Sequence, residues 1–84
     1  MIVGVPKEIK NNEYRVGMTP SGVNSFISNG HKVFVQKNAG LGSGYSNNDY
    51  KEVGAVICDT IEDVYSKSEM IIKVTEPLKS EYSL

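Results

Sequence analysis

Residues 19–36 read TPSGVNSFISNGHKVFVQ and predict a helix that leads directly into a strand. Thr19 can act as the N-cap, Pro20 suits the first helical position because its missing N–H would have no partner there, and Gly30 favours the turn that ends a helix. One apolar face recurs at helical spacing: Val23, Phe26 and Ile27. The residues after Gly30 are rich in β-branched and aromatic side chains, as a strand requires. We therefore expect a helix over 20–29 followed at once by a strand.

Further strands and helices alternate along the chain. Strands are expected in three short apolar runs: residues 2–5, 55–58 and 70–74. Ser46 and Asp49 form a capping-box pattern that opens a helix over about 47–53. Asp59 or Thr60 can cap one more helix. Its apolar residues again follow helical spacing: Ile61, Val64 and Tyr65.

The predicted order is strand, helix, strand, helix, strand, helix, strand. This alternation indicates a parallel sheet that carries helices on both faces and is connected by right-handed crossovers. The fold class is therefore α/β, an open, mainly parallel sheet of about four strands with flanking helices. Ligands of such sheets bind at the carboxyl ends of the strands. Four loops lie on that edge: residues 6–19, 37–46, 58–60 and 75–77.

Composition limits the classes of function. Eighty-four residues suit a single domain, and the net charge of −1 comes from interspersed acids and bases, so we expect no nucleic-acid or membrane partner. No apolar run is long enough for a transmembrane span, and one cysteine excludes an internal disulfide and a cysteine-based metal cluster. These features indicate a reduced, cytoplasmic protein. A chain this short without a disulfide also suits a segment of a larger protein.

The glycine-rich loop over residues 38–44, NAGLGSG, follows a strand and precedes a helix, as a dinucleotide-binding fingerprint would. Its spacing is wrong, because a fingerprint that starts at Gly40 needs its third glycine at Tyr45, and one that starts at Gly42 needs it at Asn47. We therefore expect a tight structural loop that packs near another backbone, and no cofactor-binding residue.

Arg15 is the candidate ligand-binding residue. It lies in KNNEYRVGMTP, residues 10–20, between a polar turn and the start of a helix. A guanidinium is always charged and can donate two parallel hydrogen bonds to a carboxylate. The alternative is a solvated arginine that pairs with Glu8 or Glu13.

Three other residues have structural interpretations that compete with a functional one. Lys73 lies in an apolar strand, where a buried lysine could act on a ligand, although an edge position or a stem that snorkels to solvent is the simpler interpretation. His31 follows the glycine that ends a helix and can satisfy the last helical carbonyls. Cys58 suits a small buried apolar position.

Six motifs spaced along the chain form one pattern. They are MIVGVPKEIKNNEYRV at 1–16, TPxGV at 19–23, GHxV at 30–33, AGLGSG at 39–44, GA at 54–55 and IKVxEPxxxEY at 72–82. This pattern resembles the N-terminus of bacterial alanine dehydrogenase and covers nearly the whole chain in one register. The N-terminal domain of proton-translocating transhydrogenase is similar, but it usually lacks the Lys-Asn-Asn-Glu run and the Gly-Ser-Gly loop, and it is the first alternative.

The resemblance implies a Rossmann-like fold and a role in the reversible, NAD-dependent oxidative deamination of L-alanine to pyruvate and ammonia. Residues 1–84 would then be a single N-terminal part of the catalytic, substrate-binding domain. NAD would bind to a separate, C-terminal domain, and the subunits would form a homo-oligomer. Arg15 matches the family arginine that binds the substrate carboxylate.

The family lysine that polarises the substrate carbonyl falls at Thr75. A neutral hydroxyl cannot supply the positive charge that stabilises a developing oxyanion. Lys73 lies on the same side of the predicted strand, but about 6–7 Å back along it, so it is a weaker candidate for that role.

The family's catalytic histidine falls beyond Leu84, so we expect no catalytic residue in this chain. The resemblance therefore predicts a chain that contributes part of a substrate site and is inactive alone. The alternatives are a domain like that of the transhydrogenase alpha subunit and a non-catalytic, stand-alone interaction module.

Overall fold

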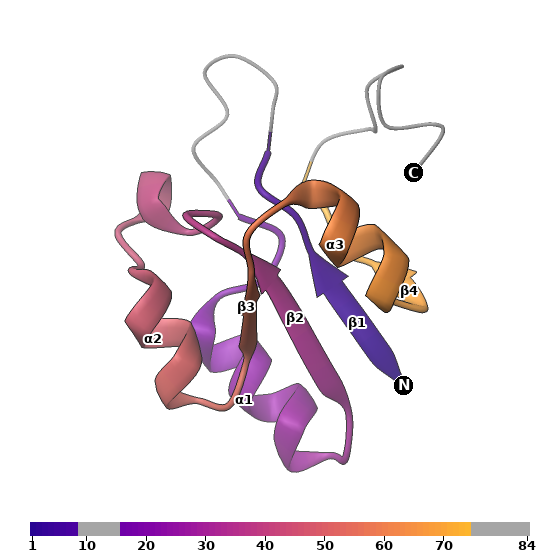
Figure 1. Cartoon of the computed structure of the whole chain (residues 1–84). Coiled ribbons are helices and arrows are strands. Elements are labelled where there is room, and N and C mark those ends of the chain that lie inside the picture. Colours follow the sequence, from indigo (N-terminus) through magenta and orange to yellow (C-terminus); the bar gives the residue numbers. More distant parts are fainter. Residues whose placement is uncertain (9–15, 75–84) are drawn as a thin grey trace.

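A computed structural model describes residues 1–8 and 16–74. Strands and helices alternate along this part of the chain, as the sequence predicts (Figure 1). The elements in order are β1 (Ile2–Val5), α1 (Pro20–Ser28), β2 (Lys32–Gln36), the 3-10 turn η1 (Leu41–Ser43), α2 (Asn47–Glu52), β3 (Val56–Cys58), α3 (Ile61–Lys67) and β4 (Met70–Ile71). The strand predicted over 70–74 is too long, because β4 ends at Ile71.

The four strands form one parallel sheet in the order β3-β2-β1-β4. Val3 of β1 lies opposite Val33 of β2 on one side and Met70 of β4 on the other. The chain moves outward from β1 to β2 and β3, and α3 then returns it to the free edge of β1. The predicted α/β fold class is confirmed, and β1 and β4 flank the point where the strand order reverses.

Two cores cover the two faces of the sheet, because neighbouring residues of a strand point to opposite faces. The larger core joins the odd-numbered valines of β1 and β2 to Val23 of α1 and Tyr50 of α2. The smaller core joins Phe34 and Cys58 to Val64 of α3. Figure 1 shows α1 and α2 side by side and α3 apart from them. Helices therefore cover both faces of the sheet.

The predicted starts of the three helices are confirmed, and α1 and α2 each end one residue earlier than predicted. The Thr19 side chain accepts a hydrogen bond from the N–H of Gly22, with Pro20 at the start of α1. Ser46 and Asp49 form a complete capping box at α2. Thr60 caps α3 by accepting a hydrogen bond from the N–H of Asp63. These local signals set where each helix begins.

The ring of Tyr50 limits the space beside Gly40 in the glycine-rich loop. A Cβ atom on Gly40 would lie 2.7 Å from the Tyr50 ring and 2.9 Å from the Cβ of Tyr45. The hydroxyl of Tyr50 donates a hydrogen bond of 2.8 Å to the carbonyl of Met18, just before α1. The loop therefore packs against side chains, and not against a second backbone as predicted.

Candidate functional site

The candidate site lies at the carboxyl ends of β1 and β4. Open α/β sheets bind their ligands at this edge, where the strand order reverses. Residues 6–8 continue from β1, and residues 72–74 continue from β4. The N–H of Lys7 donates a hydrogen bond of 2.8 Å to Oε1 of Gln36, which joins the end of β1 to the end of β2.

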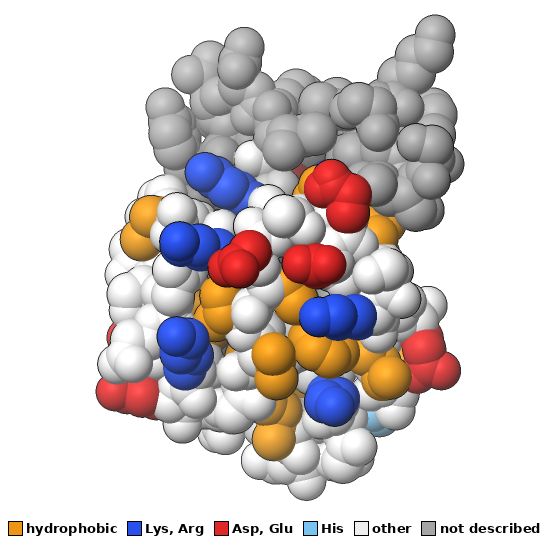
Figure 2. Space-filling view, in the orientation of Figure 1, with side chains coloured by type: hydrophobic (Ala, Val, Ile, Leu, Met, Phe, Trp, Pro, Cys, Tyr) orange, Lys and Arg blue, Asp and Glu red, His pale blue; other side chains and the backbone are white. Residues whose placement is uncertain are grey.

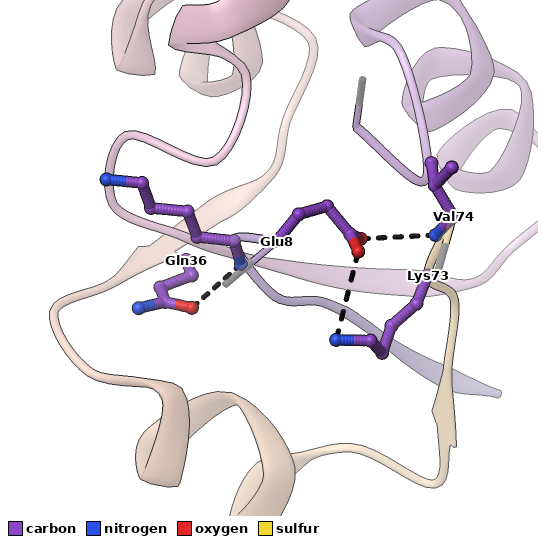
Figure 3. A network of polar contacts seen from close by, with 5 residues as sticks. Glu8, Gln36, Lys73 and Val74 are labelled. Atoms are coloured by element: carbon purple, nitrogen blue, oxygen red, sulfur yellow. Dashed lines mark hydrogen bonds and ion pairs between the residues drawn. The ribbon is translucent and has the colours of Figure 1, made fainter. Parts of the chain in front are cut away.

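Glu8 joins the end of β1 to the chain that follows β4. Its Oε2 accepts a hydrogen bond of 3.1 Å from the N–H of Val74, and its Oε1 lies 3.9 Å from Nζ of Lys73 (Figure 3). The Glu8 side chain is 2% exposed and the Lys73 side chain 6% exposed. A buried carboxylate needs both a counter-charge and a hydrogen-bond donor, and this arrangement supplies both. The contact with Lys73 is too long for a hydrogen bond, so it is an ion pair.

The segment that begins at Val16 also lies at this edge, beside residues 72–73. Gly17 lies against the backbone of Ile72 and Lys73, so closely that a Cβ atom on Gly17 would collide with the carbonyl of Ile72. Val16 and Ile72 both pack against the larger core. The segment that begins at Val16 is therefore held against the end of β4.

Of the predicted site residues, Lys73 lies in the described part of the chain, whereas Arg15 and Thr75 lie outside it. Lys73 lies beyond β4, not within a strand, and its side chain is buried and faces Glu8. Lys73 follows β4, which is an edge strand, so the predicted edge position agrees with the structure, whereas the predicted snorkelling to solvent is wrong. Val16 follows Arg15 in the sequence, and Val74 precedes Thr75. Both valines belong to the segments that meet at this edge of the sheet.

His31 lies at the other end of the sheet. Its Nδ1 is 3.2 Å from the amino nitrogen of Met1, and its ring packs against Phe26 with the centroids 5.5 Å apart. The backbone N–H of His31 donates to the carbonyl of Phe26, so the main chain, and not the predicted side chain, satisfies that carbonyl. Cys58 is buried, as predicted, and burial raises the pKa of its thiol.

The sequence predicts Glu8 in a loop at this edge, as a possible partner of Arg15, but it does not predict the contacts of Glu8 with Lys73 and Val74. A glutamate is almost never buried unless it is paired, so the residue type argued against a buried position. A usable signal was present, because Glu8 and Lys73 follow two strands whose carboxyl ends lie on the same edge of a parallel sheet.

Charged side chains of both signs are intermixed on the face drawn in Figure 2, and hydrophobic side chains lie between them. Within residues 1–8 and 16–74, no helix is long and apolar enough to cross a bilayer. The same residues contain no group of three or more His, Cys, Asp or Glu side chains that could hold a metal ion.

Residues 4–84 match the family described as the N-terminal domain of alanine dehydrogenase/PNT. An alanine dehydrogenase of Methanococcus maripaludis is 56% identical over 84 residues, which are 100% of this chain and 22% of that enzyme. The alanine dehydrogenase of Bacillus subtilis is 56% identical over 82 residues, which are 98% of this chain and 21% of that enzyme. The chain thus spans about a fifth of the length of the curated relatives that it matches.

Two solved structures share the fold along 99% of this chain. An L-alanine dehydrogenase superposes with a TM-score of 0.96 at 47% identity, over 23% of its own length. A transhydrogenase from Sinorhizobium meliloti superposes with a TM-score of 0.91 at 35% identity, over 24% of its length.

Proposed function

Because this chain belongs to the alanine dehydrogenase/PNT N-terminal domain family, we propose that it is the N-terminal, substrate-binding part of an NAD-dependent L-alanine dehydrogenase. The complete enzyme interconverts L-alanine with pyruvate and ammonia. The observation that carries the proposal is 56% identity to an alanine dehydrogenase along the whole chain. The transhydrogenase structure is less similar, at 35% identity against 47% for the alanine dehydrogenase structure.

In this proposal Arg15 binds the substrate carboxylate, and residue 75 faces the carbonyl that becomes an amine. A guanidinium suits the first role because its fork matches a carboxylate. Threonine does not suit the second, because it offers a neutral hydroxyl where negative charge develops on oxygen. Lys73 is a poor replacement, since its ammonium already faces the buried carboxylate of Glu8. We therefore expect this chain to bind the substrate but to promote the reaction only weakly.

NAD, which would accept hydride from the substrate, does not fit the glycine-rich loop of this chain. The Tyr50 ring occupies the position that a side chain at Gly40 would take, and the glycine spacing differs from a dinucleotide fingerprint, so neither observation supports NAD binding at this loop. We assign NAD to the remainder of the enzyme, which supplies the cofactor-binding domain. The other proposed partners are L-alanine or pyruvate and further copies of the subunit.

A chimeric enzyme tests the proposal. This chain replaces the matching N-terminal residues of the Methanococcus maripaludis enzyme, with which it aligns along 100% of its length. The rate of reductive amination of pyruvate is measured as the decrease in NADH absorbance. We expect weak turnover with Thr75, and we expect Thr75→Lys to raise kcat about 10²–10³-fold, the range that one group stabilising an oxyanion commonly contributes. A folded Thr75→Lys chimera without turnover would contradict the proposal.

Arg15→Ala tests the carboxylate role in the same chimera. Hydrogen bonds to charged groups contribute about 1.5–3 kcal/mol, so the KM for pyruvate should rise about 10- to 100-fold. Lys51→Ala is the matched control, because Lys51 is an exposed cation on α2. An unchanged KM in Arg15→Ala would show that another group holds the carboxylate.

A further inference from the structure

The chain beyond β4 leaves the sheet because of Pro6. The N–H of Ile72 still donates to the carbonyl of Gly4, at 2.9 Å. The next bond of a parallel ladder would run from the N–H of residue 6 to the carbonyl of Ile72, but proline has no N–H. Two residues later the N–H of Val74 donates to the side chain of Glu8. The Glu8 carboxylate thus accepts a backbone hydrogen bond beyond the point where the ladder between β1 and β4 ends.

This link is buried and charged. The side chains of Glu8 and Lys73 are 2% and 6% exposed, and they come from the segments that follow two neighbouring strands, β1 and β4. Removing one partner of a buried ion pair is strongly destabilising, so each of these two side chains helps to hold the other in place. Figure 3 shows Glu8 between the strand ends, turned toward both Val74 and Lys73.

We propose that Glu8 is a positioning residue, whose carboxylate fixes the backbone at residues 73–74 and thereby sets where residue 75 meets the substrate. The inference rests on the proposed function of residue 75. Val74 precedes residue 75 in the chain, so the hydrogen bond of the Val74 N–H lies one peptide away from the residue proposed to act on the substrate. A displacement of about 1 Å at a reacting group can cost about 10²-fold in rate. Glu8 does not contact the substrate in this role.

The kinetic test uses the Thr75→Lys chimera as the parent. Glu8→Ala should lower kcat about 10- to 100-fold and change the KM for pyruvate less than about threefold, because the carboxylate site is untouched and only the group acting in the transition state moves. Glu69→Gln is the matched control. The Glu69 side chain accepts a 2.7 Å hydrogen bond from the N–H of Ile2 at the opposite end of the β1–β4 pair. This control should leave kcat unchanged.

A conservative rescue separates positioning from simple destabilisation. Glu8→Gln combined with Lys73→Met keeps an acceptor oxygen for the Val74 N–H and removes both charges of the Glu8–Lys73 pair. We expect this double variant to recover most of the kcat that Glu8→Ala loses. A Glu8→Ala kcat within about threefold of the parent, or an equal loss in Glu69→Gln, would overturn the inference.

Amide hydrogen exchange of the 84-residue chain tests the link without turnover. Glu8→Ala should speed exchange at Val74 at least tenfold and leave exchange at Val35, inside the sheet, unchanged. Equal exchange at Val74 in both proteins would refute the link itself. An inactive Thr75→Lys parent combined with faster exchange at Val74 would instead count against the proposed function.

Discussion

Replacing Tyr50 with phenylalanine should destabilise the fold by removing one buried hydrogen bond. The Tyr50 side chain is 1% exposed, and its hydroxyl donates to the carbonyl of Met18 at 2.8 Å. Tyr50→Phe keeps the ring, so no cavity forms, but the Met18 carbonyl loses its partner. A buried acceptor left unsatisfied costs about 1–3 kcal/mol. Urea unfolding at pH 7, followed by circular dichroism, should show this loss as a lower midpoint with an unchanged slope.

The pH dependence of the stability of the wild type and of Tyr50→Phe tests whether the Tyr50 hydroxyl causes this difference. Burial raises the pKa of Tyr50 to about 12, with smaller contributions from Tyr45 and Asp49. Because the unfolded pKa is about 10, the stabilisation is complete below pH 10 and is lost as the pH rises toward 12. The advantage of the wild type over Tyr50→Phe should therefore disappear across this window.

Tyr45→Phe is the control, because its ring packs against Tyr50 at a centroid distance of 6.3 Å and its substitution leaves the Met18 bond intact. This variant should match the wild type at pH 7. If Tyr50→Phe stays within about 0.5 kcal/mol of the wild type and shows the same pH profile, then the hydroxyl does not stabilise the fold.

Two further substitutions test the packing and the helix caps. Gly4→Ala should destabilise the chain by about 1–3 kcal/mol or prevent folding, because its Cβ would lie 2.8 Å from Cγ1 of Val64 and would collide with the side chain of Ser68; thermal unfolding measures the loss. Ser46→Ala should cost about 1 kcal/mol by breaking the capping box with Asp49, and an unchanged melting temperature would contradict that role.

Local sequence signals predicted most of the fold. Thr19, Ser46 and Thr60 are caps whose effect depends on residues within three positions of them, so the sequence alone locates the helices well. The end of β4 depends instead on a proline in another strand. Because Pro6 lacks the N–H that would continue the ladder, the apolar residues after Ile71 do not form a strand.

The candidate site was harder to predict for a similar reason. Its position at the carboxyl edge follows from the strand order, but the burial of Glu8 follows from a contact between residues 66 positions apart. No local pattern marks such a contact. The resemblance to alanine dehydrogenase assigned roles to Arg15 and residue 75, and it left out the carboxylate that joins the two strand ends.

The link between β1 and β4 also has a consequence for the order of folding. The hydrogen bond from Lys7 to Gln36 closes a separation of 29 residues, and the bond from Val74 to Glu8 closes one of 66. Loop-closure entropy differs by less than about 1 kcal/mol between them, so neither is strongly favoured at equilibrium. During synthesis, however, Gln36 leaves the ribosome long before Val74. The β1–β2 pair can therefore form before the other side of β1 is paired, and the contacts between Glu8 and residues 73–74 are completed last.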